Sequence, residues 1–290
     1  MSHNPSIWKD KVALVTGGSS GIGLAIARLL AQQGAHVWMV ARRKELLESA
    51  LKEVQAARLA PGGTEHQPAE EHPSPACGIY PADVSDPAQA AAAVAQVSAQ
   101  AGVPDLLVNA AGITHPGYVQ ELSLEIFRSM MDVNYFGTVY ITKAALPGML
   151  ARGSGHIVNI CSMAGFIGAF GYSAYGASKY AVRGFTDVIR SELKPLGLLV
   201  SIVFPPDTDT AQLAYEAPFK PPETRALAGN AKVMSPEAVA KATLQQAARG
   251  RYIILPGTDA RLFYWLNGHL GNAVYPVMDW LIARARKKKH

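Results

Sequence analysis

Seven apolar runs recur along this 290-residue chain, and stretches with helical spacing separate them. Few polar residues interrupt the runs, which is typical of strands buried on both faces of a parallel sheet. The intervening helices would cover both faces, so we expect a three-layer, doubly wound α/β fold with a seven-stranded parallel sheet. The expected strands are 11–16, 36–40, 77–82, 105–112, 156–162, 198–204 and 252–256. The expected helices are 21–33, 44–59, 86–101, 123–150, 173–196 and 235–249.

Composition excludes several classes of protein. The net charge is +5, and five positive charges lie between Arg284 and Lys289, so nucleic-acid binding is not expected. The chain has two cysteines and no apolar N-terminal run, which favours a reducing, cytoplasmic location without disulfides. No uninterrupted apolar run reaches the length of a membrane-spanning helix. The segment 60–75 reads as a surface loop, and its His66 and His72 have no partners spaced for a metal site.

A glycine-rich turn, TGGSSGIG, joins the first expected strand to the first helix. Gly17 allows a sharp turn, Gly21 allows close approach of a pyrophosphate, and Gly23 allows the helix to pack on the strand. The helix N-terminus would present free N–H groups to the phosphates. The turn is therefore typical of a Rossmann dinucleotide site, although its spacing is GxxxGxG and not the commoner GxGxxG. The expected contacts here are Gly17, Ser19, Ser20, Gly21, Ile22 and Gly23.

The end of the second strand indicates which dinucleotide binds. An NAD site would carry an acidic residue there for the ribose 2′-hydroxyl, whereas this chain has Arg42 and Arg43 after Ala41. Two cations suit a 2′-phosphate, so NADP(H) is favoured. The alternative is that both arginines are solvated charges at the start of a helix.

Four polar residues are candidates for catalysis. Tyr175 and Lys179 are four residues apart on one expected helix, where an ammonium would lower the pKa of the phenol. Ser162 ends the fifth strand, where its hydroxyl could hydrogen-bond a substrate oxygen, and Asn134 could hold a water molecule linking Lys179 to solvent. Taken singly, each has an ordinary structural explanation, such as an amphipathic helix or a cap.

In combination, the glycine turn, Asn109–Gly112, Asn134, Ser162 and the Tyr175/Lys179 pair resemble the short-chain dehydrogenase/reductase family over roughly residues 10 to 256. The resemblance implies hydride transfer between a nicotinamide and a carbonyl or alcohol carbon. It implies that Tyr175 is the general acid in reduction, that Lys179 binds the nicotinamide ribose, and that Ser162 orients the carbonyl. It also implies pairing of subunits, as dimers or tetramers, through helices 123–150 and 173–196. Further cofactor contacts implied by the resemblance are Asp83, Val84, Asn109, Ala110, Gly112, Pro205, Thr208 and Thr210.

The stretch FPPDTDT, residues 204–210, departs from the general pattern of that family because Pro206 stands where glycine is usual. With KPPETR, residues 220–225, it resembles the 3-ketodihydrosphingosine reductases, which reduce 3-ketosphinganine with NADPH. Such a substrate carries an ammonium beside its ketone, so Asp207 or Asp209 could pair with it. The alternative is that Asp209 or Thr210 caps a helix beginning near Ala211.

The C-terminal stretch is rich in aromatic residues and ends in a basic cluster. Residues 261–283 include two of the four tryptophans, polar residues interrupt the apolar character, and Pro276 is expected to break a helix. We expect a catalytic domain, 1–256, and an extension, 257–290, that lies on an anionic membrane surface, with packing on the subunit itself or on a neighbouring protomer as the alternative. The expected function is NADPH-dependent reduction of a long-chain keto amine. A reductase of another ketone, such as a 3-oxoacyl thioester or a steroid, and a non-catalytic NADP-binding sensor or scaffold are the alternatives.

Overall fold

The computed structural model describes residues 6–59, 76–229 and 233–287. Within these residues, seven parallel strands form one sheet in the order β3-β2-β1-β4-β5-β6-β7. The strands are β1 (Val12–Thr16), β2 (His36–Ala41), β3 (Cys77–Pro81), β4 (Leu106–Asn109), β5 (Gly155–Ile160), β6 (Leu198–Val203) and β7 (Ile253–Ile254). The order reverses beside β1, where Thr16 pairs with Val40 on one side and Asn109 on the other. The predicted doubly wound fold is confirmed.

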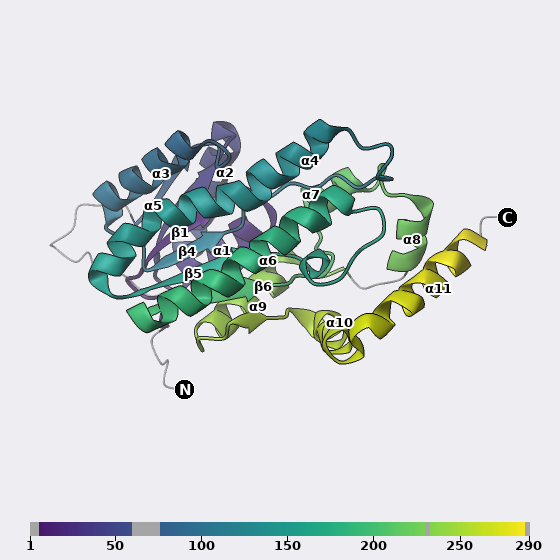
Figure 1. Cartoon of the computed structure of the whole chain (residues 1–290). Helices are drawn as coiled ribbons and strands as arrows, with labels where there is room; N and C mark the ends of the chain where they lie inside the picture. The colour runs from purple at the N-terminus through teal and green to yellow at the C-terminus, as the bar shows by residue number, and fades with distance from the viewer. Residues whose placement is uncertain (1–5, 60–75, 230–232, 288–290) are drawn as a thin grey trace.

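Helices cover both faces of the sheet and bury two apolar cores (Figure 1). One core lies under α1 (Gly21–Gln32), α2 (Lys44–Leu59) and α9 (Pro236–Ala247). The other lies under α3 (Pro87–Ala101), α5 (Gly137–Arg152) and α6 (Ser173–Leu193). The strands are buried on both sides, as their uninterrupted apolar runs predict.

The long helix expected over 123–150 is divided in the structure. It consists of α4 (Leu124–Met130), a π-helical turn (Met131–Phe136) and α5. Because a π turn inserts one extra residue per turn, it changes which side chains face the sheet, and such turns often occur at functional sites. This turn carries Asn134 and buries it.

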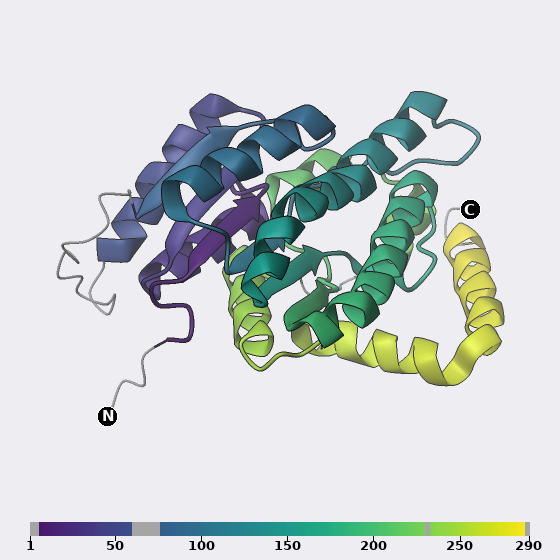
Figure 2. The ribbon, with the colours of Figure 1, turned by 60° about the vertical axis from the view of Figure 1, so that its left-hand side comes forward.

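The C-terminal extension, which we call the tail, forms two helices, α10 (Gly257–Leu270) and α11 (Val274–Lys287). The chain turns at Gly271, whose φ of 50° favours glycine, and not at Pro276 as expected. Pro276 is tolerated because it lies in the first turn of α11, where no intrahelical N–H donor is required. The turn brings α11 beside α8 (Pro222–Ala228; Figure 1), and Figure 2 shows the sharp angle between α10 and α11 from a second direction.

The loop 60–75, with His66 and His72, lies outside the described residues. Among the helices of the described part, none is long and apolar enough to cross a bilayer.

Candidate active site

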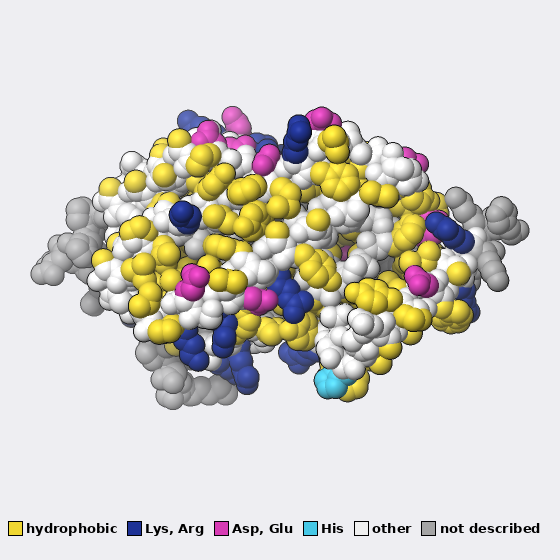
Figure 3. Space-filling view, viewed as in Figure 1, with side chains coloured by type: hydrophobic (Ala, Val, Ile, Leu, Met, Phe, Trp, Pro, Cys, Tyr) yellow, Lys and Arg dark blue, Asp and Glu magenta, His cyan; other side chains and the backbone are white. Residues whose placement is uncertain are grey.

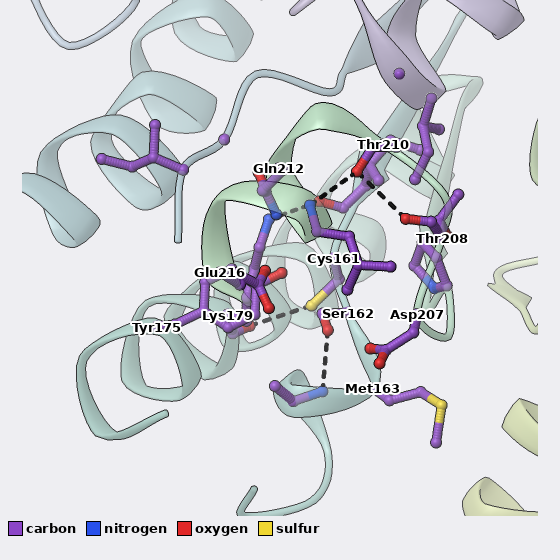
Figure 4. A pocket seen from close by; sticks show the side chains of 18 of the residues that line it. Cys161, Ser162, Met163, Tyr175, Lys179, Asp207, Thr208, Thr210, Gln212 and Glu216 are labelled. Atoms are coloured by element: carbon purple, nitrogen blue, oxygen red, sulfur yellow. Dashed lines mark hydrogen bonds between the residues drawn. The ribbon is translucent and has the colours of Figure 1, made fainter. Parts of the chain in front are cut away.

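A cavity of about 540 Å³ opens at the carboxyl ends of the strands. Its walls come from the loops after β1, β2, β3, β4, β5 and β6 and from the tail. Ligands of doubly wound sheets bind at this edge, beside the point where strand order reverses. The cavity therefore lies where the fold predicts a ligand, and Figure 4 shows its central residues.

The glycine turn forms the part of the cavity nearest α1. Gly17 has a φ of 67°, and an added Cβ there would lie 2.7 Å from the main-chain oxygen of Ala110. A Cβ at Gly23 would collide with the main-chain oxygen of Gly17. Ser20 makes no side-chain capping bond, so the first N–H groups of α1 are left for an anionic ligand. The turn fits the predicted phosphate cradle, and Ser19, Gly21 and Ile22 also line it.

Arg42 and Arg43 line the cavity at the end of β2. Both are exposed, and a guanidinium nitrogen of Arg42 lies 3.9 Å from a carboxylate oxygen of Asp83. Asp83 and Val84 line the same end. Two cations at this position suit the 2′-phosphate of NADP(H), as predicted.

Of the predicted residues after β4, Ala110 and Gly112 line the cavity, but Asn109 does not. The Asn109 amide points into the core, where it donates to Thr142 at 3.0 Å and to Asn159 at 2.9 Å. Its role as a direct cofactor contact is not supported by this placement. Asn109 instead ties β4 to β5 and α5 beneath the site.

The structure brings Ser162, Tyr175 and Lys179 together at the cavity wall. The Ser162 hydroxyl accepts the main-chain N–H of Ala164 at 3.2 Å, and it lies close enough to the Tyr175 hydroxyl to lower the pKa of that phenol. The Lys179 ammonium donates to the carbonyl of Ile160 at 3.1 Å. Two hydroxyls and an ammonium thus meet at the carboxyl end of β5, as predicted.

Asn134 lies behind this group and does not line the cavity. Its side-chain oxygen accepts the N–H of Ile113 at 2.8 Å, and its amide donates to the Ile113 carbonyl and to Ser178 on α6. These bonds fix the π turn, the loop after β4 and the catalytic helix relative to one another. Asn134 is thus a positioning residue in this structure, and its water-holding role stays a prediction.

The loop after β6 places its residues unequally. Pro205, Asp207, Thr208 and Thr210 line the cavity, whereas Asp209 does not. Thr210 caps α7 (Ala211–Glu216), because its hydroxyl accepts the N–H of Leu213 at 3.3 Å. The alternative of a cap is therefore correct for Thr210, and it leaves Asp207 as the acidic residue of this stretch at the cavity.

A second acidic residue, Glu216 at the end of α7, was not foreseen from the sequence. It is buried, lines the cavity, accepts the hydroxyl of Tyr172 at 2.6 Å and pairs with the Lys220 ammonium at 3.3 Å. Asp207 lies 3.8 Å from the same ammonium. The spacing of Glu216 and Lys220 by four residues was the available sequence signal.

Comparison with known proteins identifies the family. A model of the short chain dehydrogenases matches residues 11–219. The chain is 37% identical to a 3-dehydrosphinganine reductase of Danio rerio over 85% of this chain and 71% of the relative. It is 35% identical to a 3-ketodihydrosphingosine reductase of Dictyostelium discoideum over 95% of this chain and 83% of the relative. The chain belongs to the short-chain dehydrogenases.

A solved short-chain dehydrogenase fold supports the same conclusion. The crystal structure of an actinorhodin polyketide ketoreductase variant with NADPH is 31% identical and has a TM-score of 0.71. The similarity covers 86% of this chain and 97% of that chain. In the protein described here, the glycine turn and the two arginines after β2 fit NADP(H), and NADPH supplies a hydride when bound.

The pKa of Tyr175, the expected general acid, differs from the expectation. Desolvation raises the pKa of the Tyr175 hydroxyl above its ordinary value, and the neighbouring Ser162 hydroxyl only partly opposes this. Burial also lowers the pKa of the Lys179 ammonium. The expectation of a low pKa for Tyr175 is thus wrong for the protein alone, because burial disfavours the charged forms of both side chains.

The raised pKa is compatible with catalysis of reduction. Tyr175 must be protonated to donate, and an alkoxide is a stronger base than a phenolate, so transfer from the phenol is favourable. Ser162 can donate a second hydrogen bond to the same substrate oxygen and stabilise its developing negative charge. The arrangement therefore suits carbonyl reduction better than alcohol oxidation at neutral pH.

Proposed function

We propose that this short-chain dehydrogenase reduces the ketone of a long-chain α-amino ketone with NADPH, with 3-ketodihydrosphingosine as substrate and dihydrosphingosine as product. The observation that carries the proposal is the pair of carboxylates, Asp207 and Glu216, in the same cavity as Ser162 and Tyr175. The names of the relatives from Danio rerio and Dictyostelium discoideum support it.

The carboxylates lie close enough to the reacting group to recognise a neighbouring amine. The charges of both Glu216 and Asp207 contribute to the raised pKa of Tyr175. The ring of Tyr172, which donates to Glu216, lies 5.9 Å from the ring of Tyr175. In an α-amino ketone the nitrogen is one carbon away from the carbonyl, so a carbonyl held by Tyr175 places its ammonium beside this acidic pair.

Lys220 keeps the acidic pair in place without neutralising it. Its ammonium contacts both carboxylates, and its side chain is only 11% exposed. Two carboxylates and one ammonium leave a net charge of −1, which favours a substrate cation over a neutral or anionic group. We therefore assign Asp207 and Glu216 as the ammonium anchor; Asp209, which does not line the cavity, is not part of it.

The first test is NADPH oxidation with 3-ketodihydrosphingosine and with a matched ketone that lacks the amine. Because a hydrogen bond to a charged group contributes about 1.5–3 kcal/mol, Glu216→Gln and Asp207→Asn should lower kcat/KM for the amino ketone about tenfold to a hundredfold. Both variants should change turnover of the amine-free ketone by less than about threefold. Asp209→Asn is the control and should change neither. Equal losses on both ketones would contradict the anchor, and NADPH binding without oxidation of any ketone would support the sensor alternative.

The similarity to a polyketide ketoreductase favours a second candidate, a reductase of a 3-oxoacyl thioester. Such a substrate has no amine, so the acidic pair would play no part in its recognition. A higher kcat/KM for a 3-oxoacyl thioester than for 3-ketodihydrosphingosine would favour this candidate over the amino ketone.

We also propose that the outer face of the tail contacts an anionic membrane surface on the cytoplasmic side. Trp265 and Trp280 are more than half exposed there, and the guanidinium of Arg284 lies 5.5 Å from the ring centre of Trp280. Hydrophobic side chains reach the surface in this region (Figure 3). Exposed aromatics beside cations are typical of helices that lie in the interface of a bilayer.

Flotation with vesicles tests this contact. The wild-type chain should float with vesicles of phosphatidylcholine and phosphatidylserine and less with phosphatidylcholine alone. The double variant Trp265→Ser, Trp280→Ser should stay at the bottom of the gradient, whereas Leu59→Ser, at an exposed apolar residue of α2, should float normally. Flotation of the double variant would contradict the proposal.

The expected pairing of subunits through helices 123–150 and 173–196 stays a prediction. Each of these two stretches has an exposed aromatic side chain, Phe136 in the first and Tyr180 in the second.

A further inference from the structure

The tail does more than extend the catalytic domain, because its inner face forms part of the cavity wall. Phe263 from α10 and Met278 and Leu281 from α11 line the cavity that also contains Tyr175 and Ser162. These side chains therefore share one continuous space with the catalytic group. A ligand bound at Tyr175 can therefore extend towards the tail without leaving the cavity.

The wall at the tail is mainly apolar. Ile167, from the loop before α6, and Leu227 of α8 line the same cavity. These side chains offer no hydrogen-bonding groups. The tail also contributes the carboxylate of Asp259, from the first turn of α10. A cavity with polar groups at one end and apolar walls elsewhere is suited to a ligand whose polar head is fixed and whose remainder is hydrocarbon.

An ion pair holds α11 against α8 at this wall. The guanidinium of Arg286 donates to Glu223 of α8 at 3.1 Å, and the hydroxyl of Tyr118 donates to the other Glu223 oxygen at 2.7 Å. The Arg286 guanidinium also lies 6.0 Å from the ring centre of Phe170, a residue of the cavity wall. Because Glu223 is buried at this point, the position of α11 relative to α8 is defined by a specific set of bonds.

Helix α11 has two different faces. Met278 and Leu281 are partly buried against the cavity, whereas Val277 and Trp280 are 49% and 58% exposed. The same helix therefore presents one apolar face to the cavity and another to solvent. A substitution on the cavity face, such as at Leu281, can therefore be compared with the same kind of substitution on the solvent face, such as at Val277.

We propose that the inner face of the tail, formed by Phe263, Met278 and Leu281, binds the alkyl chain of the substrate and selects for its length. The proposal rests on the proposed function, since it assigns the hydrocarbon part of the same α-amino ketone whose polar part lies at Tyr175 and Glu216. Each methylene group transferred from water to this wall raises kcat/KM, by up to about fourfold per group. The gain ends when the chain outgrows the wall.

The test compares two variants of α11 on a homologous series of α-amino ketones that differ only in alkyl chain length. Leu281→Gln places an amide in the cavity wall, and Val277→Gln makes the same kind of change on the outer face. Leu281→Gln should lower kcat/KM for the longest ketone at least about tenfold, through KM, and leave the shortest ketone within about twofold. Val277→Gln should leave the whole series unchanged. Equal effects of Leu281→Gln on short and long ketones, or no effect on either, would overturn the proposal.

A binding measurement separates this proposal from the proposed function. A fluorescent long-chain alkylamine should bind the wild-type chain and the Val277→Gln variant, and Leu281→Gln should weaken its binding at least about tenfold. A second wall variant, Met278→Gln, should weaken it as well, which guards against a folding defect in one variant. If no α-amino ketone is reduced but this pattern of binding holds, the proposed reaction fails and the alkyl site stands. Equal binding by all four proteins would exclude the alkyl site whatever the reaction.

Discussion

The Lys179 ammonium lies 5.7 Å from the centre of the Tyr175 ring. Lys179 is buried, and its ammonium donates a hydrogen bond to the Ile160 carbonyl at 3.1 Å. The two side chains are neighbours on α6 because they are four residues apart. Their closeness does not make a low-pKa phenol, since desolvation raises the pKa of Tyr175. The phenol is instead a donor that stays protonated through neutral pH.

The raised pKa gives a prediction for the dependence of the two reaction directions on pH. Reduction uses the protonated phenol, so the rate with an amine-free ketone should stay constant from about pH 6 to about pH 9. Oxidation of the alcohol uses the phenolate, so its rate should rise with pH across that range. Initial rates in both directions, measured with saturating cofactor, check this. A reduction rate that falls with an apparent pKa near neutrality would contradict the assignment.

The two arginines at the end of β2 should determine the choice of cofactor. Arg42→Ala and Arg43→Ala should each raise KM for NADPH about tenfold to a hundredfold, because each loses a charged contact to the 2′-phosphate. KM for NADH should stay within about twofold. Arg128→Ala, at an exposed arginine of α4 away from the cavity, is the matched control. An equal rise in KM for both cofactors would show that the arginines do not read the 2′-phosphate.

Two glycine substitutions should change the free energy of unfolding in opposite directions. Gly23→Ala puts a Cβ against the Gly17 oxygen, so it should lower the free energy of unfolding by about 1–3 kcal/mol and weaken NADPH binding. Gly184→Ala, on the exposed face of α6 with no atom near the added Cβ, should raise the free energy of unfolding by up to about 1 kcal/mol. Urea unfolding of both variants, with and without NADPH, measures the difference. A Gly23→Ala variant with wild-type stability and NADPH affinity would refute the close packing of the turn.

The features that could be predicted from the sequence depend on local order along the chain. Continuous apolar runs predicted all the strands, and the spacing of Tyr175 and Lys179 placed both on one helix. The π-helical turn was missed because residues 131–136 keep a helical apolar pattern although the hydrogen bonding changes.

Other features depend on contacts between distant segments. Glu216 is held at the cavity by Tyr172, which is 44 residues earlier in the chain. Asn109 turns inwards because its partners, Thr142 and Asn159, come from α5 and β5. No local pattern marks such partners. Packing of the tail on the subunit was an open alternative, but its partner α8 could not be predicted for the same reason, since the Arg286–Glu223 pair joins residues 63 positions apart.

The most direct measurement compares Tyr175→Phe with Tyr172→Phe in single-turnover reduction of an amine-free ketone. Both tyrosines line the same cavity and their rings are 5.9 Å apart, so the two changes remove neighbouring hydroxyls. Loss of the general acid should slow the Tyr175→Phe variant about a hundredfold to ten-thousandfold while NADPH binding persists, and Tyr172→Phe should stay within about threefold of the wild type. A Tyr175→Phe variant that reduces the ketone at the wild-type rate would contradict the account.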